Sequence, residues 1–95
     1  MPEYEGGMPA LARYIKANLK YPKRAKENEI QGRVIIRFVV SKSGKIEDVK
    51  VVKSLYEFCD DEAVRVVKNM PDWIPGKQNG KAVSVYYTIP IDFTL

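Results

Sequence analysis

The sequence contains no histidine and only one cysteine, Cys59, among its 95 residues. Histidine is the commonest general base and the commonest metal ligand in proteins, so its absence argues against most acid–base and metal-dependent enzymes. A single cysteine cannot form an internal disulfide bond, and no C-x-x-C, H-E-x-x-H, G-x-S-x-G or phosphate-loop pattern occurs. We therefore expect no enzymatic activity, no bound metal and no cofactor.

Long apolar runs are also missing, and none reaches the roughly 18 residues that a membrane-spanning helix needs. The opening stretch, MPEYEGGMPAL, is acidic and contains glycines, unlike a signal peptide. We expect any membrane anchor or export signal of the natural protein to lie outside this chain. The length suits a single domain, which we expect over residues 8–95 after a flexible lead-in over residues 1–7.

Positive charge exceeds negative charge, with a formal net charge of +4. Such a balance favours acidic partners, for example nucleic acid, anionic lipid or a cell-wall polymer such as peptidoglycan. The densest basic stretch is interrupted at once by Glu27 and Glu29, so a solvated surface is the preferred interpretation. That stretch comprises Lys16, Lys20, Lys23, Arg24 and Lys26.

Two helices are predicted before the first strand. In MPALARYIKANLKYP the apolar residues recur at helical spacing on one face: Leu11, Tyr14, Ile15 and Leu19. Pro22 ends this helix or starts the next, because the residue before a proline is disfavoured in the helical region. The stretch PKRAKENEIQG suits a short second helix closed by Gly32.

A hairpin follows over RVIIRFVVSKSGKIEDVKVVKS. Its first strand alternates, with Val34, Ile36, Phe38 and Val40 on one face. The SKSG segment supplies turn residues, and Gly44 can adopt positive φ. Alternation breaks in the second strand, which indicates a bulge or a sharp twist.

A third helix is predicted over FCDDEAVRVVKNMP. Its apolar stripe is Cys59, Ala63, Val66, Val67 and Met70. Asp60 or Asp61 is expected to cap the helix, which explains the acidic run with Glu62 better than a metal site does. For Cys59 we prefer a buried thiol over a reactive one, and for Trp73 we prefer a loop anchor over a binding contact.

The chain closes on one long alternating stretch, GKAVSVYYTIPIDFTL. Tyr87 belongs to the apolar parity and is expected to face the core, whereas Tyr86 faces outward. The element order predicts an α+β fold: a three-stranded antiparallel sheet with helices packed on one face. The expected strand order is second, first, third (2-1-3), which places the C-terminal strand at an edge.

Pro90 supports this edge position, because a proline cannot donate an amide hydrogen to a central ladder. Two interpretations of such a strand are open. The proline can blunt the edge against aggregation, or the strand can stay open so that a peptide adds to it. An open edge can also pair with a second copy of the chain, giving a homodimer.

The order and spacing of several short motifs resemble the C-terminal domain of the TonB energy-transducer family, over about residues 6–95. The upstream EGGMPALARYIKANLKYP is also similar to the lead-in of many members from one branch of Gram-negative bacteria. The matching elements are Tyr21-Pro22, Ala25, Gly32, the SGKI turn, and Trp73 with Pro75-Gly76-Lys77.

The resemblance implies a periplasmic domain, carried on a proline-rich linker and anchored in the inner membrane by one helix that this chain lacks. An inner-membrane proton-channel complex would energise the whole protein. The domain would bind the TonB box, a short extended segment of an outer-membrane transporter, and transmit force for nutrient uptake. Backbone pairing tolerates different sequences, so one domain could serve several TonB-dependent transporters.

Carried over by position, the resemblance implies a partner strand along the final strand and a neighbouring segment just before Pro22. The strand residues are Val83, Ser84, Val85, Tyr86, Tyr87, Thr88 and Ile89, and the neighbouring residues are Asn18, Lys20 and Tyr21. Two alternatives stay open. The domain can be an interaction module fused to a membrane-bound peptidase or sensor, or a basic cell-wall or nucleic-acid binder. Binding to nucleic acid, which we do not expect, would weaken steeply with salt.

Overall fold

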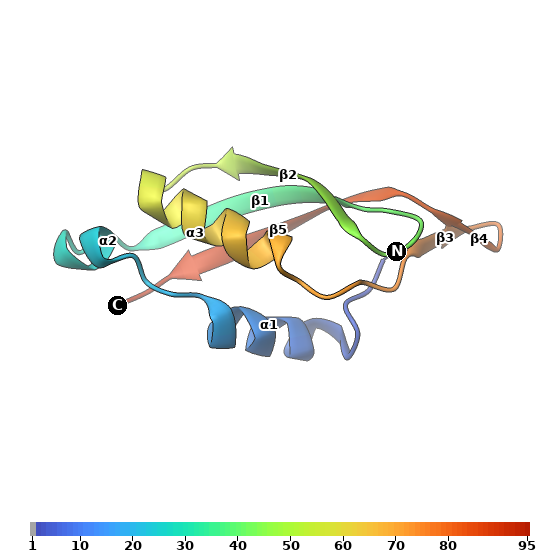
Figure 1. The fold of residues 1–95 in the computed structure, drawn as a ribbon, viewed down its shortest axis with the longest axis horizontal. Helices are drawn as coiled ribbons and strands as arrows, with labels where there is room; N and C mark the ends of the chain where they lie inside the picture. Colours follow the sequence, from blue (N-terminus) through green and yellow to red (C-terminus); the bar gives the residue numbers. More distant parts are fainter. Residues whose placement is uncertain (1) are drawn as a thin grey trace.

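The computed structural model describes residues 2–95, in which a three-stranded antiparallel sheet is flanked by helices (Figure 1). The sheet order is β2-β1-β5, and β3 and β4 form a separate two-stranded sheet. The predicted α+β class and strand order are therefore confirmed. The elements are α1 (Gly7–Asn18), α2 (Lys23–Glu27), β1 (Gly32–Val40), β2 (Ile46–Lys53), α3 (Glu57–Lys68), β3 (Gly76–Gln78), β4 (Lys81–Val83) and β5 (Val85–Phe93).

The hairpin of β1 and β2 has the predicted turn and the predicted irregularity. Gly44 adopts a φ of 86°, and the register between the two strands shifts twice. The turn is also fixed to the loop after α3, because the backbone nitrogen of Trp73 donates to the carbonyl oxygen of Gly44 at 2.7 Å. A glycine is needed here for space as well as for conformation: a Cβ on Gly44 would lie 2.1 Å from the Trp73 carbonyl oxygen.

Helix α3 buries its predicted stripe, but it does not begin as predicted. It starts at Glu57, and no side chain caps its first turn. The Asp60 carboxylate instead accepts hydrogen bonds from the Ser54 hydroxyl and, at 3.0 Å, from the backbone nitrogen of Leu55. The prediction that Asp60 or Asp61 caps this helix was wrong, because Asp60 lies one turn inside it and binds the preceding loop.

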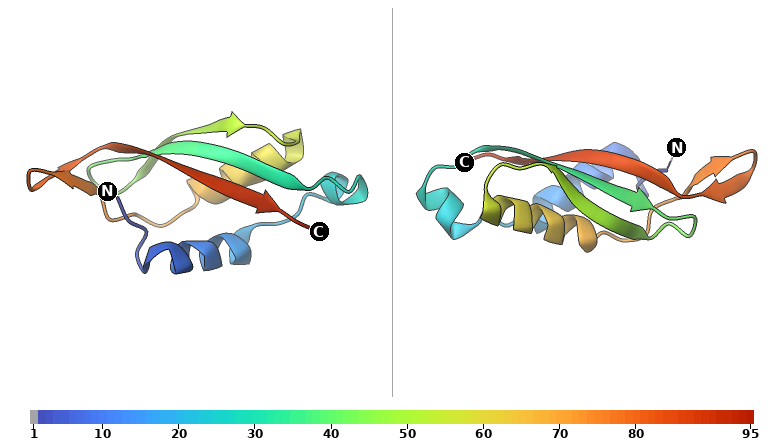
Figure 2. Two further views of the ribbon diagram at one scale, coloured as in Figure 1. Left: turned by 180° about the vertical axis from the view of Figure 1, so that it is seen from behind. Right: turned by 90° about the horizontal axis from the view of Figure 1, so that it is seen from above.

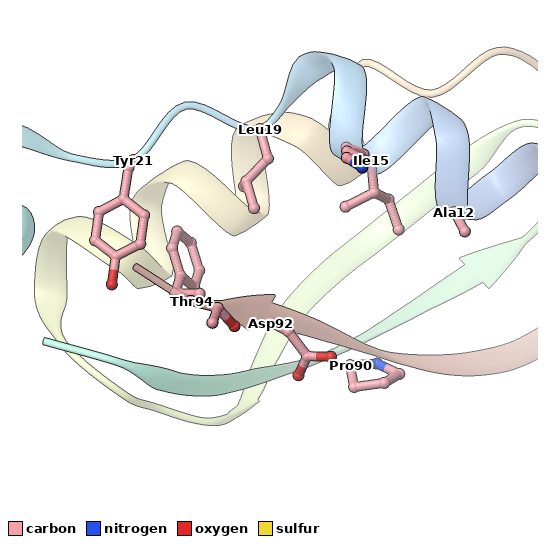
Figure 3. Close-up of a pocket in the computed structure, with 9 residues that line it drawn as sticks. Ala12, Ile15, Leu19, Tyr21, Pro90, Asp92 and Thr94 are labelled. Carbon is pink, nitrogen blue, oxygen red and sulfur yellow. The ribbon is translucent and has the colours of Figure 1, made fainter.

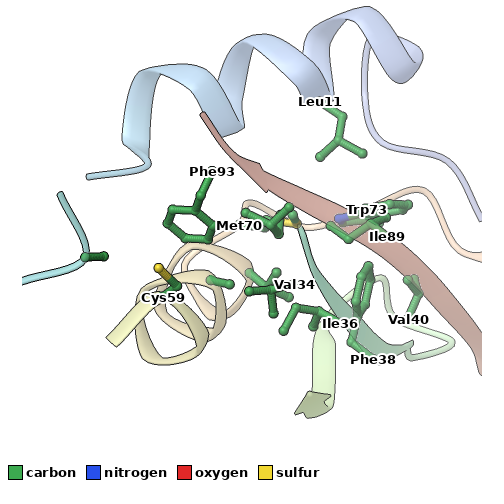
Figure 4. Close-up of a cluster of buried hydrophobic side chains, with 14 residues drawn as sticks. Leu11, Val34, Ile36, Phe38, Val40, Cys59, Met70, Trp73, Ile89 and Phe93 are labelled. Atoms are coloured by element: carbon green, nitrogen blue, oxygen red, sulfur yellow. The ribbon is translucent and has the colours of Figure 1, made fainter. Parts of the chain in front are cut away.

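The core lies between the inner face of the sheet and the helices (Figure 4). Trp73 is buried as predicted, with its ring 5.4 Å from that of Phe38 and 5.0 Å from that of Tyr87. Tyr87 packs against the core, whereas Tyr86 is 68% exposed, also as predicted. The buried cluster consists of Leu11, Ala25, Val34, Ile36, Phe38, Val40, Cys59, Ala63, Val67, Met70, Trp73, Ile89, Ile91 and Phe93.

Residues 2–6, which belong to the predicted flexible lead-in over residues 1–7, contact the rest of the domain. Glu3 and Ile74 exchange two backbone hydrogen bonds of 2.8 and 2.7 Å. Pro2 is buried, and the Tyr4 ring lies 5.7 Å from Trp73. These contacts hold the chain just before α1; Met1 lies outside the described residues.

Helix α1 runs beside β5, on the side of that strand opposite β1 (Figures 1 and 2). It ends at Asn18; Leu19 is extended, and Lys20 lies in the segment that leads to α2. Of its predicted apolar face, only Leu11 is fully buried, and Tyr14 and Ile15 are half-buried. The short α2 is confirmed, although it ends at Glu27 and Gly32 opens β1 instead of closing the helix.

The closing stretch forms two strands, where the alternation predicted one. Lys81–Val83 is β4, which pairs with β3 across a turn at Asn79 and Gly80. Both turn residues have positive φ, 53° and 79°, as the type I′ turn of two-residue hairpins requires. The Asn-Gly pair is the strongest short hairpin signal in a sequence, and it could have revealed this hairpin inside the predicted loop.

Candidate partner-binding edge

Strand β5 is paired on one side only. Its residues from Val85 to Phe93 pair with β1 from Val40 to Gly32 without a shift in register. No strand in the described residues lies on its other side, because the sheet order ends at β5. The predicted edge position of the C-terminal strand is therefore confirmed.

Pro90 indicates which backbone groups face the unpaired side. It lies opposite Ile35 in an uninterrupted ladder, so its nitrogen, which carries no hydrogen, must point away from β1. Leu95 supports this assignment. It is an odd-numbered residue, and its backbone nitrogen points to the β1 side, where it donates to the Gln31 side chain at 3.0 Å. The even-numbered residues therefore present the open donors, namely the backbone N–H groups of Tyr86, Thr88 and Asp92.

The seven residues that the resemblance assigned to the partner strand do not all lie on β5. Val85, Tyr86, Tyr87, Thr88 and Ile89 lie on β5. Val83 lies on β4, opposite Gly76, and Ser84 links the two strands. The open edge thus begins at Val85 and extends past Ile89 to Phe93, which the sequence did not indicate.

A groove lies between the open edge and α1 (Figure 3). Its volume is about 550 Å³. Ile15 and Leu19 point into it from the α1 side, across from Pro90 and Asp92 on β5 (Figure 3). The sequence analysis missed this groove. We call it the α1–β5 groove, and its lining residues are Ala12, Ile15, Lys16, Leu19, Tyr21, Pro90, Asp92, Phe93 and Thr94.

The three residues expected near a bound peptide differ in their positions. Tyr21 lines the α1–β5 groove, its ring lies edge-on to that of Phe93 at 5.6 Å, and its hydroxyl donates to the Ile30 carbonyl. Asn18 and Lys20 are exposed but do not line the groove. Their backbones bind α3: the Asn18 carbonyl accepts from Arg65 at 2.8 Å, and the Lys20 nitrogen donates to Glu62 at 2.6 Å.

Glu62 is the electrostatic centre of this link between α1 and α3. Arg65 donates to both of its carboxylate oxygens, each at 2.7 Å. Burial alone would raise the pKa of Glu62, but the Arg65 hydrogen bonds, the Lys20 N–H and both positive charges outweigh it and lower that pKa. Glu62 is therefore ionised at neutral pH and acts as a fixed anchor for the end of α1.

The outer face of the sheet beside the open edge carries arginines from β1. The Arg37 guanidinium lies 5.1 Å from the centre of the exposed Tyr86 ring, a cation–π distance. Arg33 pairs with Asp92 at 2.7 Å, and this hydrogen bond and charge raise the pKa of Arg33. These contacts orient Tyr86 and Asp92 on either side of Thr88 and Pro90.

The one thiol of the chain belongs to Cys59. Cys59 is buried, and burial raises the pKa of its thiol. Residues 2–95 hold no group of three or more potential metal-ligating side chains among their cysteine, aspartate and glutamate residues. Within the same residues, no helix combines the length and the apolar character that crossing a membrane requires.

Comparison with known proteins gives the family of the chain. The family model described as Gram-negative bacterial TonB protein C-terminal matches residues 17–95. Protein TonB of Helicobacter pylori is 29% identical over 82 residues, which cover 85% of this chain and 27% of that protein. Protein tonB2 of Pseudomonas aeruginosa is 35% identical over 77 residues, covering 80% of this chain and 28% of that protein.

Solved structures agree with this match. The solution structure of the H. pylori TonB C-terminal domain superposes with a TM-score of 0.69 at 25% identity, covering 92% of this chain and 91% of that one. The P. aeruginosa TonB C-terminal domain gives a TM-score of 0.64 at 27% identity, covering 80% and 77%. The chain belongs to the TonB C-terminal domain family. It spans little more than a quarter of the length of these curated relatives.

Proposed function

We propose that the chain is the partner-binding domain of a TonB-type energy transducer, and that it binds the TonB box of outer-membrane transporters by strand addition to β5. The observation that carries the proposal is the asymmetry of β5, which is fully paired with β1 on one side and unpaired on the other over Val85–Phe93. Strand addition to an exposed sheet edge is a recurring mode of peptide recognition, in which backbone hydrogen bonds supply much of the affinity.

The expected affinity is modest. A segment of five or six residues would form a few backbone hydrogen bonds, each contributing about 0.5–1.5 kcal/mol net. Ordering a flexible peptide and associating two molecules cost free energy that cancels much of this gain. The tightest binding we expect has a dissociation constant in the micromolar range, which corresponds to a binding free energy of about −8 kcal/mol. Weak binding suits a domain that must release its partner after each cycle of transport.

The proposal extends to the whole protein of which this domain would be a part. The domain would lie in the periplasm, and the inner-membrane anchor and proton-channel complex would supply the energy. It would act by binding and transmitting force, without catalysis. The membership of the chain in the TonB C-terminal family supports this assignment.

The test is an NMR titration of the ¹⁵N-labelled domain with synthetic TonB-box peptides from transporters of the same organism. Saturable shifts of the β5 amides, above all those of Tyr86, Thr88 and Asp92, are the expected result. A series of peptides, each N-methylated at one position, adds a sharper criterion. Because alternate peptide N–H groups would face β5, binding should be lost at every second position. An unchanged spectrum at millimolar peptide, or binding indifferent to N-methylation, would refute strand addition.

A further inference from the structure

We propose that α1, as one wall of the α1–β5 groove, helps to determine which partner segments bind. The groove accepts the alternate, inward side chains of the segment that pairs with β5, and it selects for apolar residues at those positions. This inference rests on the proposed function and adds a side-chain requirement to backbone pairing. It assigns the contacts to Ala12, Ile15 and Leu19, none of which lies on the sheet.

The first step of the argument is the direction of the inward side chains. A strand added to β5 would lie about 4.8 Å from it, and its alternate side chains would point to opposite faces of the sheet. Those opposite Ile89, Ile91 and Phe93 would share the inner face, because these three residues are buried there. Helix α1 lies on that face, since Leu11 packs in the same core cluster. The inward side chains would therefore meet α1.

The second step is the character of the α1 surface that they would meet. Ala12 and Ile15 lie three positions apart on α1, Leu19 directly follows the helix, and all three side chains line the groove. Ala12 is exposed, and Ile15 and Leu19 are only half-buried, so the domain leaves this apolar stripe partly uncovered beside an unpaired edge. The volume of about 550 Å³ lies within the range of ligand pockets, about 300–1,000 Å³. Apolar side chains of the partner would complete its burial.

A second, smaller hollow of about 150 Å³ continues the groove along the same helix. Met8, Leu11 and Ile89 are among its lining residues, and it shares Ala12, Ile15 and Pro90 with the α1–β5 groove. The two hollows together follow β5 for several residues. An extended segment would thus present more than one inward side chain to α1.

Charge adds a further selection. Two charged residues line the α1–β5 groove, Lys16 and Asp92. Arg33 neutralises Asp92 at 2.7 Å, whereas Lys16 has no ion-pair partner among the described residues. Because Asp92 lies with Arg33 on the outer face, Lys16 is the groove charge that an inward side chain would meet, and it disfavours a basic side chain there.

The last step is that α1 is held in place, so the groove exists before the partner binds. The Tyr14 hydroxyl donates to the Val66 carbonyl of α3 at 2.9 Å. At the end of the helix, the hydrogen bonds of Glu62 and Arg65 to the Lys20 and Asn18 backbones add two more links. A preformed wall lowers the ordering cost of binding, which makes α1 part of the binding surface.

The experiment compares two exposed alanines of α1. Ala12→Phe fills the groove, whereas Ala17→Phe adds the same side chain to a position that does not line it. Binding of a TonB-box peptide is measured by NMR titration, with thermal unfolding and amide dispersion as controls for folding. We expect about tenfold weaker binding to the Ala12→Phe domain, a loss of about 1.4 kcal/mol, and unchanged binding to the Ala17→Phe domain.

Changing the peptide tests the same surface from the other side. Alanine or lysine at an inward peptide position should weaken binding to the wild-type domain more than the same change at an outward position. Leu19→Ala in the domain should reduce this difference. If Ala12→Phe binds like the wild type while the β5 amides still shift, the wall inference is wrong and strand addition stands. If no peptide shifts the β5 amides, the proposed function fails and the wall inference fails with it.

Discussion

The backbone nitrogen of Lys20 donates a hydrogen bond of 2.6 Å to Oε2 of Glu62, which lies 42 residues further along the chain. The same oxygen accepts from Arg65, and Arg65 also donates to the Asn18 carbonyl. One carboxylate thus joins the end of α1 to the middle of α3. Because α1 forms one wall of the α1–β5 groove, the geometry of the groove depends on this carboxylate.

Removing the charge of Glu62 should destabilise the domain and change its response to acid. The folded-state pKa of Glu62 is lowered, so its stabilisation is complete above the ordinary glutamate pKa of about 4.3 and is lost as the pH falls through the lowered value. At pH 7, Glu62→Gln should lower the free energy of unfolding by about 1–2 kcal/mol. Urea unfolding at pH 7 and below pH 5 measures both effects. An acid response as steep in the Glu62→Gln domain as in the wild type would contradict this prediction.

Two glycines with similar backbone conformations should differ strongly in their tolerance of alanine. Gly44 has a φ of 86° and Gly80 a φ of 79°, but only at Gly44 does a backbone carbonyl block the Cβ. Gly80→Ala should lower the free energy of unfolding only by the cost of holding alanine in the left-handed conformation, about 1–2 kcal/mol. Gly44→Ala should also displace the loop at Trp73 and cost more than about 3 kcal/mol. Chemical denaturation measures the free energy of unfolding of both variants. Equal losses of stability would show that the contact with Trp73 is unimportant.

One glycine and one proline illustrate why much of the fold could be predicted. Gly44 marked the β1–β2 turn, and Pro90 marked an edge strand, because each residue restricts its own backbone. The helix start at Glu57 could not be found in this way. Asp60 has the chemistry of a helix cap, but it binds Ser54 and Leu55, and this choice depends on the path of the preceding loop.

The candidate site was only partly predictable for the same reason. The parity of the closing strand separated Tyr86 from Tyr87 correctly, since alternation is a local property. The α1–β5 groove joins residues some 70 positions apart, for example Leu19 and Pro90. The sequence predicted that Leu19 belongs to an apolar helix face, but the helix ends at Asn18, and the spacing could not show that Leu19 remains half uncovered beside β5.

The thiol of Cys59 should be unreactive in the folded domain. It is fully buried, and burial, followed by the nearby charge of Asp60, raises its pKa. At pH 8 the thiol is protonated and inaccessible, so a disulfide reagent such as DTNB should react with it only after unfolding. The reaction is followed by absorbance in buffer and in denaturant, with free cysteine as a control. Rapid labelling of the folded domain would mean that the start of α3 opens readily.

Pro90 should protect the open edge against pairing with a second copy of the chain. It removes one outward N–H from the middle of β5, and an uninterrupted edge is a template for association. Pro90→Ala restores that donor without changing the register with β1, so it should promote concentration-dependent dimers. Pro71→Ala, in the exposed loop after α3, is the matched control and should leave the association state unchanged. Sedimentation velocity over a hundredfold range of concentration compares the three proteins. If Pro90→Ala sediments like the wild type at every concentration, the missing donor does not limit self-association, and α1, which lies along the same edge, becomes the element to test.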